Sequence, residues 1–219
     1  MMHIYLDIET IPSQRADVIE RGPELVKVPA SYKNEEKIEA YRAEHADEAY
    51  RRTALDGGYG EIACICWAVD DGPVEESTRA SADESEADLL ARFFAAAKAA
   101  ADASPASLPA FVGHNIAFDL RFLHHRSVVL GVHPPIHLPY NAASWQGRYV
   151  DTMFEWSGAR DSIKLTTLCD VLGVEVDDEI DGSQVWDRYQ AGDIDTIVKH
   201  CRADVERVRQ VYRRLQYLD

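Results

Sequence analysis

The pattern of apolar and polar residues predicts strands on both sides of a long polar segment near the start of the chain, alternating before it and nearly all apolar after it. Residues 3–9 alternate and are rich in β-formers, which predicts a first strand, and the nearly all-apolar residues 61–70 predict a central second strand. A turn at Asp-Gly-Pro leads to a weaker third strand at residues 74–80. Between the first two strands, residues 13–58 predict a helical insertion, whose clearest element is a polar helix over residues 34–55.

The rest of the chain alternates between short apolar strands and helices. Residues 85–101 have the pattern of an amphipathic helix, and its expected buried residues are Leu89, Leu90, Phe93, Phe94 and Ala97. Further strands are predicted at 110–115 and 148–153, and further helices at 117–131, 164–173, 182–192 and 194–217. The order predicts an α/β fold, in which a mixed sheet (an antiparallel meander plus parallel strands) is flanked by helices. A chain of 219 residues predicts one domain, residues 1–219.

Composition and charge limit the possible locations and partners. The chain has no apolar run of the roughly 20 residues that a membrane helix needs and no signal-peptide pattern, so we expect a cytoplasmic protein without a membrane partner. The formal net charge is -15, whereas proteins that grip long nucleic acid usually present a basic surface. Tight non-specific binding to duplex nucleic acid is therefore not expected, and nothing indicates a particular protein partner.

Four cysteines are spread along the chain. Cys64 and Cys66 are two residues apart in the predicted second strand, while Cys169 and Cys201 are isolated in sequence. No CxxC pair occurs, so a zinc site is not expected. Reduced, mostly buried thiols are the simplest interpretation.

Acidic residues in predicted core elements carry the first chemical signal. Asp7 and Glu9 are two apart in the first strand, so both side chains point to the same face. Two acids on one face of a central strand are costly unless something compensates them, and a hard cation such as Mg²⁺ would do so. The alternative is that they lie at the strand end in water.

A third acid lies at a turn between a strand and a helix. Asp119 belongs to the sequence GHNIAFDLRFL, where Gly113 permits close backbone approach and Asn115 is placed to cap the helix. Phe118 and Phe122 flank it on a helix that otherwise has a core pattern. Asp119 is therefore either a favourable partner of the helix dipole or part of a site.

A fourth acid belongs to the last helix. Its apolar stripe consists of Ile197, Cys201, Val205, Val208, Tyr212 and Leu215. His200 and Asp204 are four residues apart at the edge of that stripe, so they lie on one face of the helix. Taken alone, Asp204 is explained by pairing with Arg207, and His200 by a position on the helix surface.

Together these motifs have a recognisable order. DxE on a first strand, then GHNxxFD, then HxxxD on a terminal helix resembles the DEDD-type 3′–5′ exonucleases of the ribonuclease H-like superfamily. The resemblance is strongest to the subgroup related to the proofreading exonuclease domains of family B polymerases. The segments LDIETIP, GHNIAFDLRFLHHR, DGSQVWDRYQAGDID and HCRADV carry it, and it extends from Ile4 to about Leu215 as a stand-alone domain.

The resemblance implies roles for particular residues. Asp7, Glu9, Asp119 and Asp204 would hold two divalent metal ions, Mg²⁺ or Mn²⁺, and together with His200 they would form the catalytic set. These exonucleases carry either a tyrosine four residues before the last acid or a histidine five before it. His200 combines the histidine with the tyrosine's spacing, and an imidazole with a reference pKa near 6.5 can accept a proton at neutral pH.

The resemblance also indicates how substrate would be held. Thr10, Asn115, Phe118 and Phe122 are the expected substrate-binding residues, and Trp145, Trp186 and Tyr189 are further aromatic side chains able to stack on bases. The segment His124, His125 and Arg126 either contacts phosphates or is ordinary solvated surface.

We therefore expect a metal-dependent 3′–5′ exonuclease that acts on the 3′ end of single-stranded nucleic acid, with DNA as the expected substrate. One alternative is an exonuclease for RNA 3′ ends or short oligonucleotides, which would share the site. Another is a nucleic-acid-binding module with weakened catalysis, favoured only by the exchange at His200. A serine hydrolase is not supported, because no GxSxG motif occurs.

Overall fold

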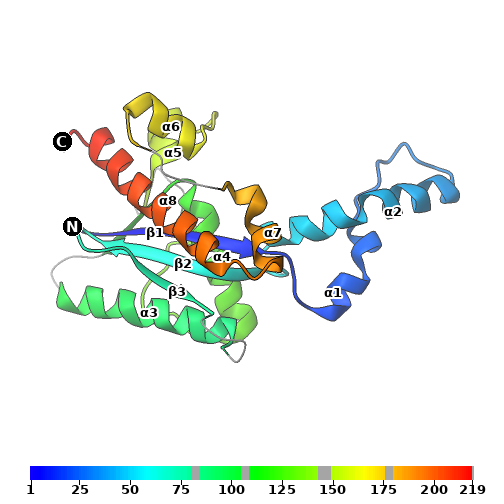
Figure 1. Ribbon diagram of the computed structural model, residues 1–219, viewed down its shortest axis with the longest axis horizontal. Helices are drawn as coiled ribbons and strands as arrows, with labels where there is room; N and C mark the ends of the chain where they lie inside the picture. Colours follow the sequence, from blue (N-terminus) through cyan, green and yellow to red (C-terminus); the bar gives the residue numbers. More distant parts are fainter. Residues whose placement is uncertain (80–83, 105–108, 143–148, 176–179, 219) are drawn as a thin grey trace.

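The computed structural model describes residues 1–79, 84–104, 109–142, 149–175 and 180–218. Its centre is a five-stranded mixed sheet in the order β3-β2-β1-β4-β5 (Figure 1). The strands are β1 (Met2–Ile11), β2 (Glu61–Val69), β3 (Glu75–Thr78), β4 (Pro109–Gly113) and β5 (Tyr149–Asp151). β1, β2 and β3 form an antiparallel meander, while β4 and β5 run parallel to β1. The predicted α/β architecture is confirmed.

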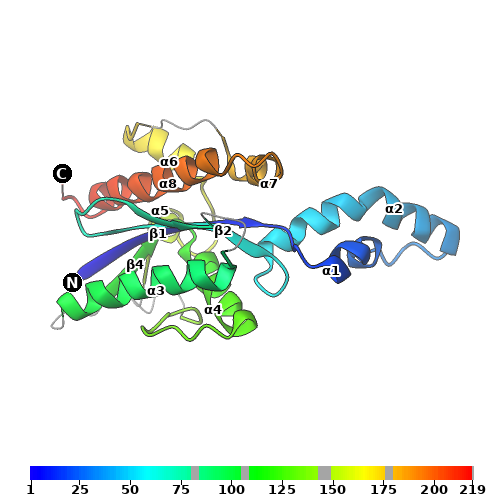
Figure 2. The same cartoon turned by 60° about the horizontal axis from the view of Figure 1, so that its bottom comes forward.

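Helices cover both faces of the sheet (Figure 2). On one face lie α3 (Glu86–Ala103) and α4 (Ile116–Leu130), and on the other lies α8 (Ile194–Leu215), with the shorter helices α5 (Thr152–Ser157), α6 (Leu165–Leu172) and α7 (Val185–Gln190). The five residues predicted to be buried on α3 are all buried. The apolar stripe of α8 packs on the opposite face of the sheet and is buried as predicted except at Leu215, which is partly exposed. No helix in the described part of the chain combines the length and apolar character needed to cross a membrane.

The two faces of β1 receive different side chains. Ile4, Leu6 and Ile8 belong to the core beneath α3 and α4, whereas Tyr5 belongs to the core beneath α8. Because successive strand residues alternate between faces, Asp7 and Glu9 are directed toward α8. This alternation places the two acids on the face of the sheet covered by the helix that carries His200 and Asp204.

The segment between β1 and β2 projects from the sheet as an arm, residues 16–55, beyond the end of β1 (Figures 1 and 2). It contains α1 (Ala16–Glu20), a 3₁₀ turn at Gly22–Leu25, α2 (Glu35–Arg51) and a second 3₁₀ turn, Arg52–Leu55. The predicted polar helix is confirmed: α2 begins after Asn34, whose side chain accepts a hydrogen bond from Lys37 N–H, and α2 has no buried residue. α1 was not predicted, because its five residues show too little periodicity.

The base of the arm is fixed to the body of the protein. The backbone N–H of Ser13 donates to Thr53 Oγ1 at 3.0 Å, and the Tyr50 hydroxyl donates to the Ser13 carbonyl at 3.0 Å. Arg51 forms an ion pair with Asp187 of α7 at 2.8 Å. These contacts hold the second 3₁₀ turn against the end of β1.

The loop DGGYG after the arm packs directly on α4. A Cβ atom at Gly57 would lie 2.8 Å from the Cβ of His125, and one at Gly60 would lie 2.5 Å from the carbonyl oxygen of Thr53. Real Cβ atoms do not approach so closely, so both positions require glycine. The sequence predicted a turn here, and the structure adds that the turn joins the arm to α4.

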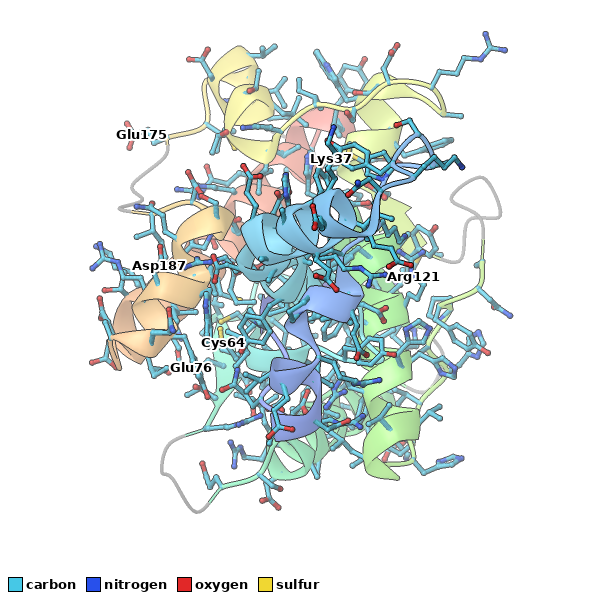
Figure 3. The ribbon with its side chains drawn as sticks, turned by 90° about the vertical axis from the view of Figure 1, so that its right-hand side faces the viewer. Lys37, Cys64, Glu76, Arg121, Glu175 and Asp187 are labelled. Atoms are coloured by element: carbon cyan, nitrogen blue, oxygen red, sulfur yellow. The ribbon has the colours of Figure 1, made fainter. Side chains whose placement is uncertain are left out.

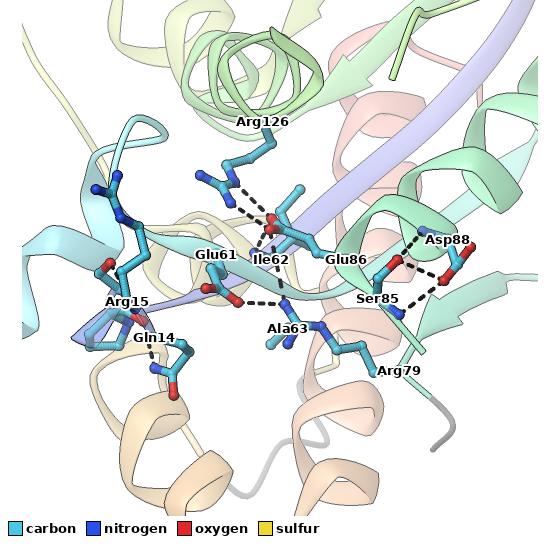
Figure 4. Close-up of polar contacts among 12 residues, drawn as sticks. Gln14, Arg15, Glu61, Ile62, Ala63, Arg79, Ser85, Glu86, Asp88 and Arg126 are labelled. Atoms are coloured by element: carbon cyan, nitrogen blue, oxygen red, sulfur yellow. Dashed lines mark hydrogen bonds and ion pairs between the residues drawn. The ribbon is translucent and has the colours of Figure 1, made fainter. Parts of the chain in front are cut away.

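A buried ion-pair network ties α3, α4 and β2 together (Figure 4). Glu86 accepts hydrogen bonds from Arg126 Nε at 2.9 Å and Nη2 at 2.6 Å, and from the backbone N–H of Ile62 at 2.8 Å. Arg126 is 5% exposed, so both sequence interpretations of this residue, phosphate contact and solvated surface, are wrong. It acts within the core, where it also donates to the Gly57 carbonyl at 3.2 Å.

One predicted strand ends earlier than expected. Thr152 and Met153 were predicted to continue β5, but they begin α5 instead. The Asp151 side chain accepts hydrogen bonds from the backbone N–H groups of Met153 at 3.1 Å and Phe154 at 3.4 Å. This capping stabilises a helical turn directly after a three-residue strand.

Candidate active site

The acids of β1 lie together near the C-terminal end of the strand. Asp7 pairs with Cys66 and Glu9 with Cys64 across the antiparallel ladder, so both acids share one face as predicted. The register shifts directly after Glu9. Such irregularities increase the local twist and re-aim side chains, and they are frequent beside functional sites.

A tight turn between β4 and α4 delivers Asp119. Asn115 has a left-handed backbone (φ 61°), and its N–H donates to Asp151 Oδ1 at 2.9 Å. Gly113 is needed because a Cβ there would lie 2.8 Å from the Cβ of Ile116. Asn115 occupies the N-cap position as predicted, but its side chain makes no capping hydrogen bond. The turn places Asp119 in the first turn of α4 with 5% of its surface exposed.

α8 contributes His200 and Asp204 from successive turns. His200 Nε2 lies 3.3 Å from Glu9 Oε1 and 4.0 Å from Asp204 Oδ2. With 7% of its surface exposed, His200 is buried against carboxylates, so its interpretation as a surface histidine is wrong. Asp204 also forms the expected ion pair with Arg207, and this pairing coexists with its position in the acidic cluster.

One cleft of about 530 Å³ gathers residues from segments far apart in the chain. Its described lining residues include five acids, two histidines and one lysine, namely Asp7, Glu9, Asp119, Asp181, Asp204, His114, His200 and Lys164. Asn115 and Phe118 line the same cleft. Acids therefore outnumber permanent cations among the described residues that line this cleft.

The acids perturb one another. Burial raises the pKa of Asp7 well above its usual value, and the neighbouring charges of Glu9, Asp204 and Asp119 raise it further. Burial also raises the pKa of Asp119, with additional contributions from Asp151 and Asp204. Asp7 and Asp119 are thus costly to ionise, as expected where like charges share a site of low polarity.

Asp7 carries the clearest sign that a ligand atom is needed. Its Oδ2 is buried and has no hydrogen-bond partner among the residues that the structure describes. A buried unsatisfied carboxylate oxygen is destabilising unless a cation or hydrogen-bond donor meets it. One ligand atom each from Asp7, Glu9 and Cys201 lies within 4.8 Å of the others. These groups can hold a metal ion, and the carboxylate oxygens suit a hard divalent cation.

Cys201 lies directly behind the acidic cluster. Its thiol donates to the Asp7 carbonyl oxygen at 3.4 Å, and burial raises the pKa of the thiol well above its usual value. Its sulfur is also grouped with those of Cys64 and Cys66, all within 4.8 Å of one another. The expectation of buried thiols is confirmed, but Cys201 is isolated only in sequence.

The proposed substrate-binding residues occupy different environments. Phe118 and Asn115 face the cleft, whereas Phe122 is 2% exposed and packs in the core against Phe118, at 5.6 Å between ring centroids. Phe122 therefore supports Phe118 and is not among the described residues that line the carboxylate cleft. Thr10 is partly buried beside the irregularity in β1 and is not among the described residues that line the cleft.

The other aromatic candidates lie away from the carboxylates. Trp186 is partly buried on α7 and stacks with Tyr189, at 6.0 Å between ring centroids. Tyr50 at the base of the arm packs against Trp186 edge-on. These contacts give both side chains of α7 a packing role, and Trp145 lies outside the described residues.

Sequence reasoning missed two polar residues that shape the site. Asp151 is 5% exposed, positions Asn115 through its Oδ1 and raises the pKa of Asp119. His114 lies 3.0 Å from Thr152 Oγ1 through Nδ1 and 2.8 Å from the Ile163 carbonyl through Nε2. An available signal for Asp151 was its place at the end of a short strand, where a helix cap or a site residue is expected.

Fold and site together define a ribonuclease H-like α/β protein with a carboxylate-lined cleft at the end of its central strand. Residues 59–219 match a family described as predicted 3′–5′ exonuclease related to the exonuclease domain of PolB, and the chain belongs to this family. The resemblance to this subgroup is confirmed. The match begins after the arm, so Asp7 and Glu9 precede it in sequence. A search of curated proteins found no match.

Proposed function

We propose that this protein is a metal-dependent 3′–5′ exonuclease that hydrolyses phosphodiester bonds from the 3′ end of single-stranded nucleic acid. One observation carries the proposal: acids from β1, α4 and α8 converge on one cleft, where Asp7 Oδ2 is buried without a hydrogen-bond partner in the described part of the chain. The family's description supports the direction of attack. DNA is the expected substrate, and the whole chain is proposed to act as one domain in the cytoplasm.

The carboxylates of Asp7, Glu9, Asp119 and Asp204 would hold the metal ions. Three separate elements supply them, because one short segment cannot surround two ions. When bound there, two divalent ions, Mg²⁺ or Mn²⁺, lower the pKa of the attacking water and stabilise the departing oxygen. Asp151 and Cys201 orient this set from behind through Asn115 and the backbone of Asp7.

The reaction replaces one P–O bond with another. The oxygen of a water molecule bonds to the phosphorus of the last phosphodiester, and the bond from phosphorus to the 3′ oxygen of the preceding nucleotide breaks. The products are a nucleoside 5′-monophosphate and a strand shortened by one nucleotide, whose 3′ oxygen takes up a proton. Phe118 would stack on the terminal base and so place this phosphodiester beside the carboxylates.

His200 would handle the proton of the attacking water. Its Nε2 is the atom that faces Glu9 and Asp204, so a water molecule among these groups lies within its reach. A neutral imidazole can accept the proton there, and it also orients the water through a hydrogen bond. The tyrosine that occupies this spacing in related exonucleases can orient the water but does not accept its proton at neutral pH.

The test uses 5′-labelled single strands of DNA and RNA, each about 20 nucleotides long, with Mg²⁺ or Mn²⁺. The expected result is a ladder of products shortened stepwise from the 3′ end, abolished by chelator and by Asp7→Asn. A 3′-blocked strand should resist attack. Internal cleavage of a closed circular single strand, or full activity in chelator, would contradict the proposal, and the preferred sugar follows from the two ladders.

A further inference from the structure

Two further hollows extend from the carboxylate cleft toward the arm. The first, of about 220 Å³, lies between α4 and the loop after the arm and shares Phe118 with the cleft. The second, of about 510 Å³, lies under the arm and shares Leu55 and Asp56 with the first. Neighbouring hollows share lining residues, so they adjoin one another, and we call the two hollows beyond the cleft the arm groove.

The charges along the arm groove differ from those of the protein as a whole. Its described lining includes three permanent cations, Lys27, Arg52 and Arg121, and two acids, Glu48 and Asp56. The net charge of the chain is -15, so an excess of cations along one path is unusual for this protein. An anionic chain that leaves the cleft in this direction meets more cations than acids among the described lining residues.

Two of these cations are available to a ligand. Arg52 lies 3.7 Å from Glu48, which partly neutralises it. Arg121 and Lys27 have no ion pair within the described residues. Arg121 is exposed on α4 beside the base of the arm, as a view from the arm's end shows (Figure 3). It stands one helical turn from Phe118, at the junction between the cleft and the arm groove.

Exposed flat and apolar side chains accompany the cations. Leu55 is 65% exposed and Tyr59 is 36% exposed, and both line the hollow under the arm. Unstacked bases bind such faces, and alternation of cations with aromatic side chains is typical of single-strand binding surfaces. The contacts of Ser13 with Thr53 and the close packing of Gly57 on α4 fix the groove before any ligand binds.

We propose that the arm groove binds the nucleotides that precede the 3′ end, so that a single strand runs from the carboxylates past Phe118 and Arg121 and along the arm. This inference rests on the proposed function and adds a second binding region to it. The family match begins at residue 59, so the arm is a feature of this chain that the matched part of the family does not explain. Continuity with the cleft favours nucleic acid over a protein ligand as the occupant.

The decisive variant is the double substitution Lys27→Met with Arg121→Met. The matched control is Lys33→Met with Lys37→Met, which removes the same charge from exposed lysines near and on α2 that do not line the groove. All four side chains are partly or fully exposed, so thermal unfolding should be unchanged in both proteins. Substrates are a 5′-labelled strand of about 20 nucleotides and a trinucleotide too short to reach the arm.

Loss of two phosphate contacts should lower kcat/KM for the long strand by about tenfold and for the trinucleotide by less than about twofold. In a plot of log Kd against log salt concentration, the magnitude of the slope should fall by about 1.4, since each single-strand phosphate contact contributes about 0.7 to it. The control should match the unmodified protein. Equal losses of kcat/KM on both substrates would contradict the proposal that the arm groove binds the strand. A double variant with the same kcat/KM as the control would contradict it too.

A binding assay separates this inference from the proposed function. Fluorescence anisotropy measures the affinity of the long strand for the Asp7→Asn protein with and without the two groove substitutions, in Mg²⁺. If the unmodified protein shows no hydrolysis while the groove substitutions weaken binding about tenfold, the proposed function fails and the groove stands. Hydrolysis with no effect of the groove substitutions on binding overturns the groove alone, and no binding of any strand overturns both.

Discussion

Two groups of buried carboxylates in this protein have opposite surroundings. Glu86 lies between α3, α4 and β2, where Arg126 and the Ile62 N–H satisfy both of its oxygens and Arg79 lies 4.0 Å away. Asp7 and Asp119 lie among other acids, and one oxygen of Asp7 has no hydrogen-bond partner within the described ranges. The first arrangement is complete by itself, whereas the second is one that a bound cation would compensate.

The difference separates structural from functional burial of charge. When an acid is buried against an arginine, the pairing offsets the free-energy cost of burying its charge. Removal of either partner leaves the other as an uncompensated buried charge. When acids are buried against one another, nothing within the fold offsets the free-energy cost of their charges unless a ligand binds. Replacing such an acid should therefore raise the stability of the protein while it abolishes the proposed activity. The two sites therefore make opposite predictions for the same kind of substitution.

Asp7→Asn should have the largest effect on activity. It keeps the shape of the side chain but weakens the proposed metal site, whose contribution of several kcal/mol corresponds to a loss of about 10³-fold or more in kcat. Thermal stability without metal should stay equal or rise. Steady-state hydrolysis and thermal unfolding measure both, with Glu86→Gln as the matched control. Activity within tenfold of the unmodified protein would remove Asp7 from the catalytic set.

Arg126→Met should have the opposite effects, a large loss of stability with little change in activity. It leaves Glu86 as an uncompensated buried charge, which typically costs about 3–5 kcal/mol in the free energy of unfolding. The kcat per folded molecule should change little, because Arg126 does not line the carboxylate cleft. Denaturant unfolding measures the loss, and adding Glu86→Leu to the same protein should restore most of it. An unchanged midpoint would show that this network contributes nothing to stability.

His200→Gln should reduce kcat by about 10²-fold or more while changing KM little, since a general base typically contributes that much. Glutamine is preferred to alanine because His200 is 7% exposed, so truncation would leave a cavity that the sequence interpretation did not anticipate. His200→Tyr should retain more activity than His200→Gln if orientation of the water dominates. His133→Gln on the surface is the control, and a His200→Gln protein as fast as the control would make the imidazole a bystander.

The smallest effect concerns pH and stability. Folding raises the pKa values of Asp7 and Asp119. Between their ordinary and their raised pKa values, the folded state therefore binds more protons than the unfolded state. The stability from this protonation is fully present below their ordinary value near 4 and is lost as pH rises through the raised values. Without divalent ions, Asp7→Asn should therefore melt a few degrees above the unmodified protein at pH 7, and the gap should narrow toward pH 5. Calorimetry in chelator measures the gap, and a constant gap would refute the coupling.

The sequence was sufficient for the frame of the fold, and the four acids and the histidine that it singled out line one cleft. Local periodicity predicted every strand and the long helices, and strand alternation placed Asp7 and Glu9 on one face. The spacing of His200 and Asp204 predicted their shared helix face in the same way. Such features depend on neighbours within a few residues, so a single chain contains their signal.

Features that depend on contacts between distant segments were not predictable. Arg126 resembles a surface residue in a run with two histidines, and only its position opposite Glu86, 40 residues earlier in the chain, makes it a core residue. The grouping of Cys201 with Cys64 and Cys66 and the burial of Asp151 have the same origin. Phe118 and Phe122 share a helix and a residue type, and only their packing shows which one faces the cleft.

The count of bound Mn²⁺ in metal-stripped protein tests most directly whether the acidic cluster is a metal site. Electron paramagnetic resonance during a titration with Mn²⁺ gives the number and affinity of the ions without reference to any substrate. Two ions should bind to the unmodified protein and to Glu86→Gln, whereas Asp7→Asn should lose at least one of them or bind it far more weakly. No bound Mn²⁺ in the unmodified protein, or equal binding by Asp7→Asn, would contradict the assignment of the cleft as a metal centre.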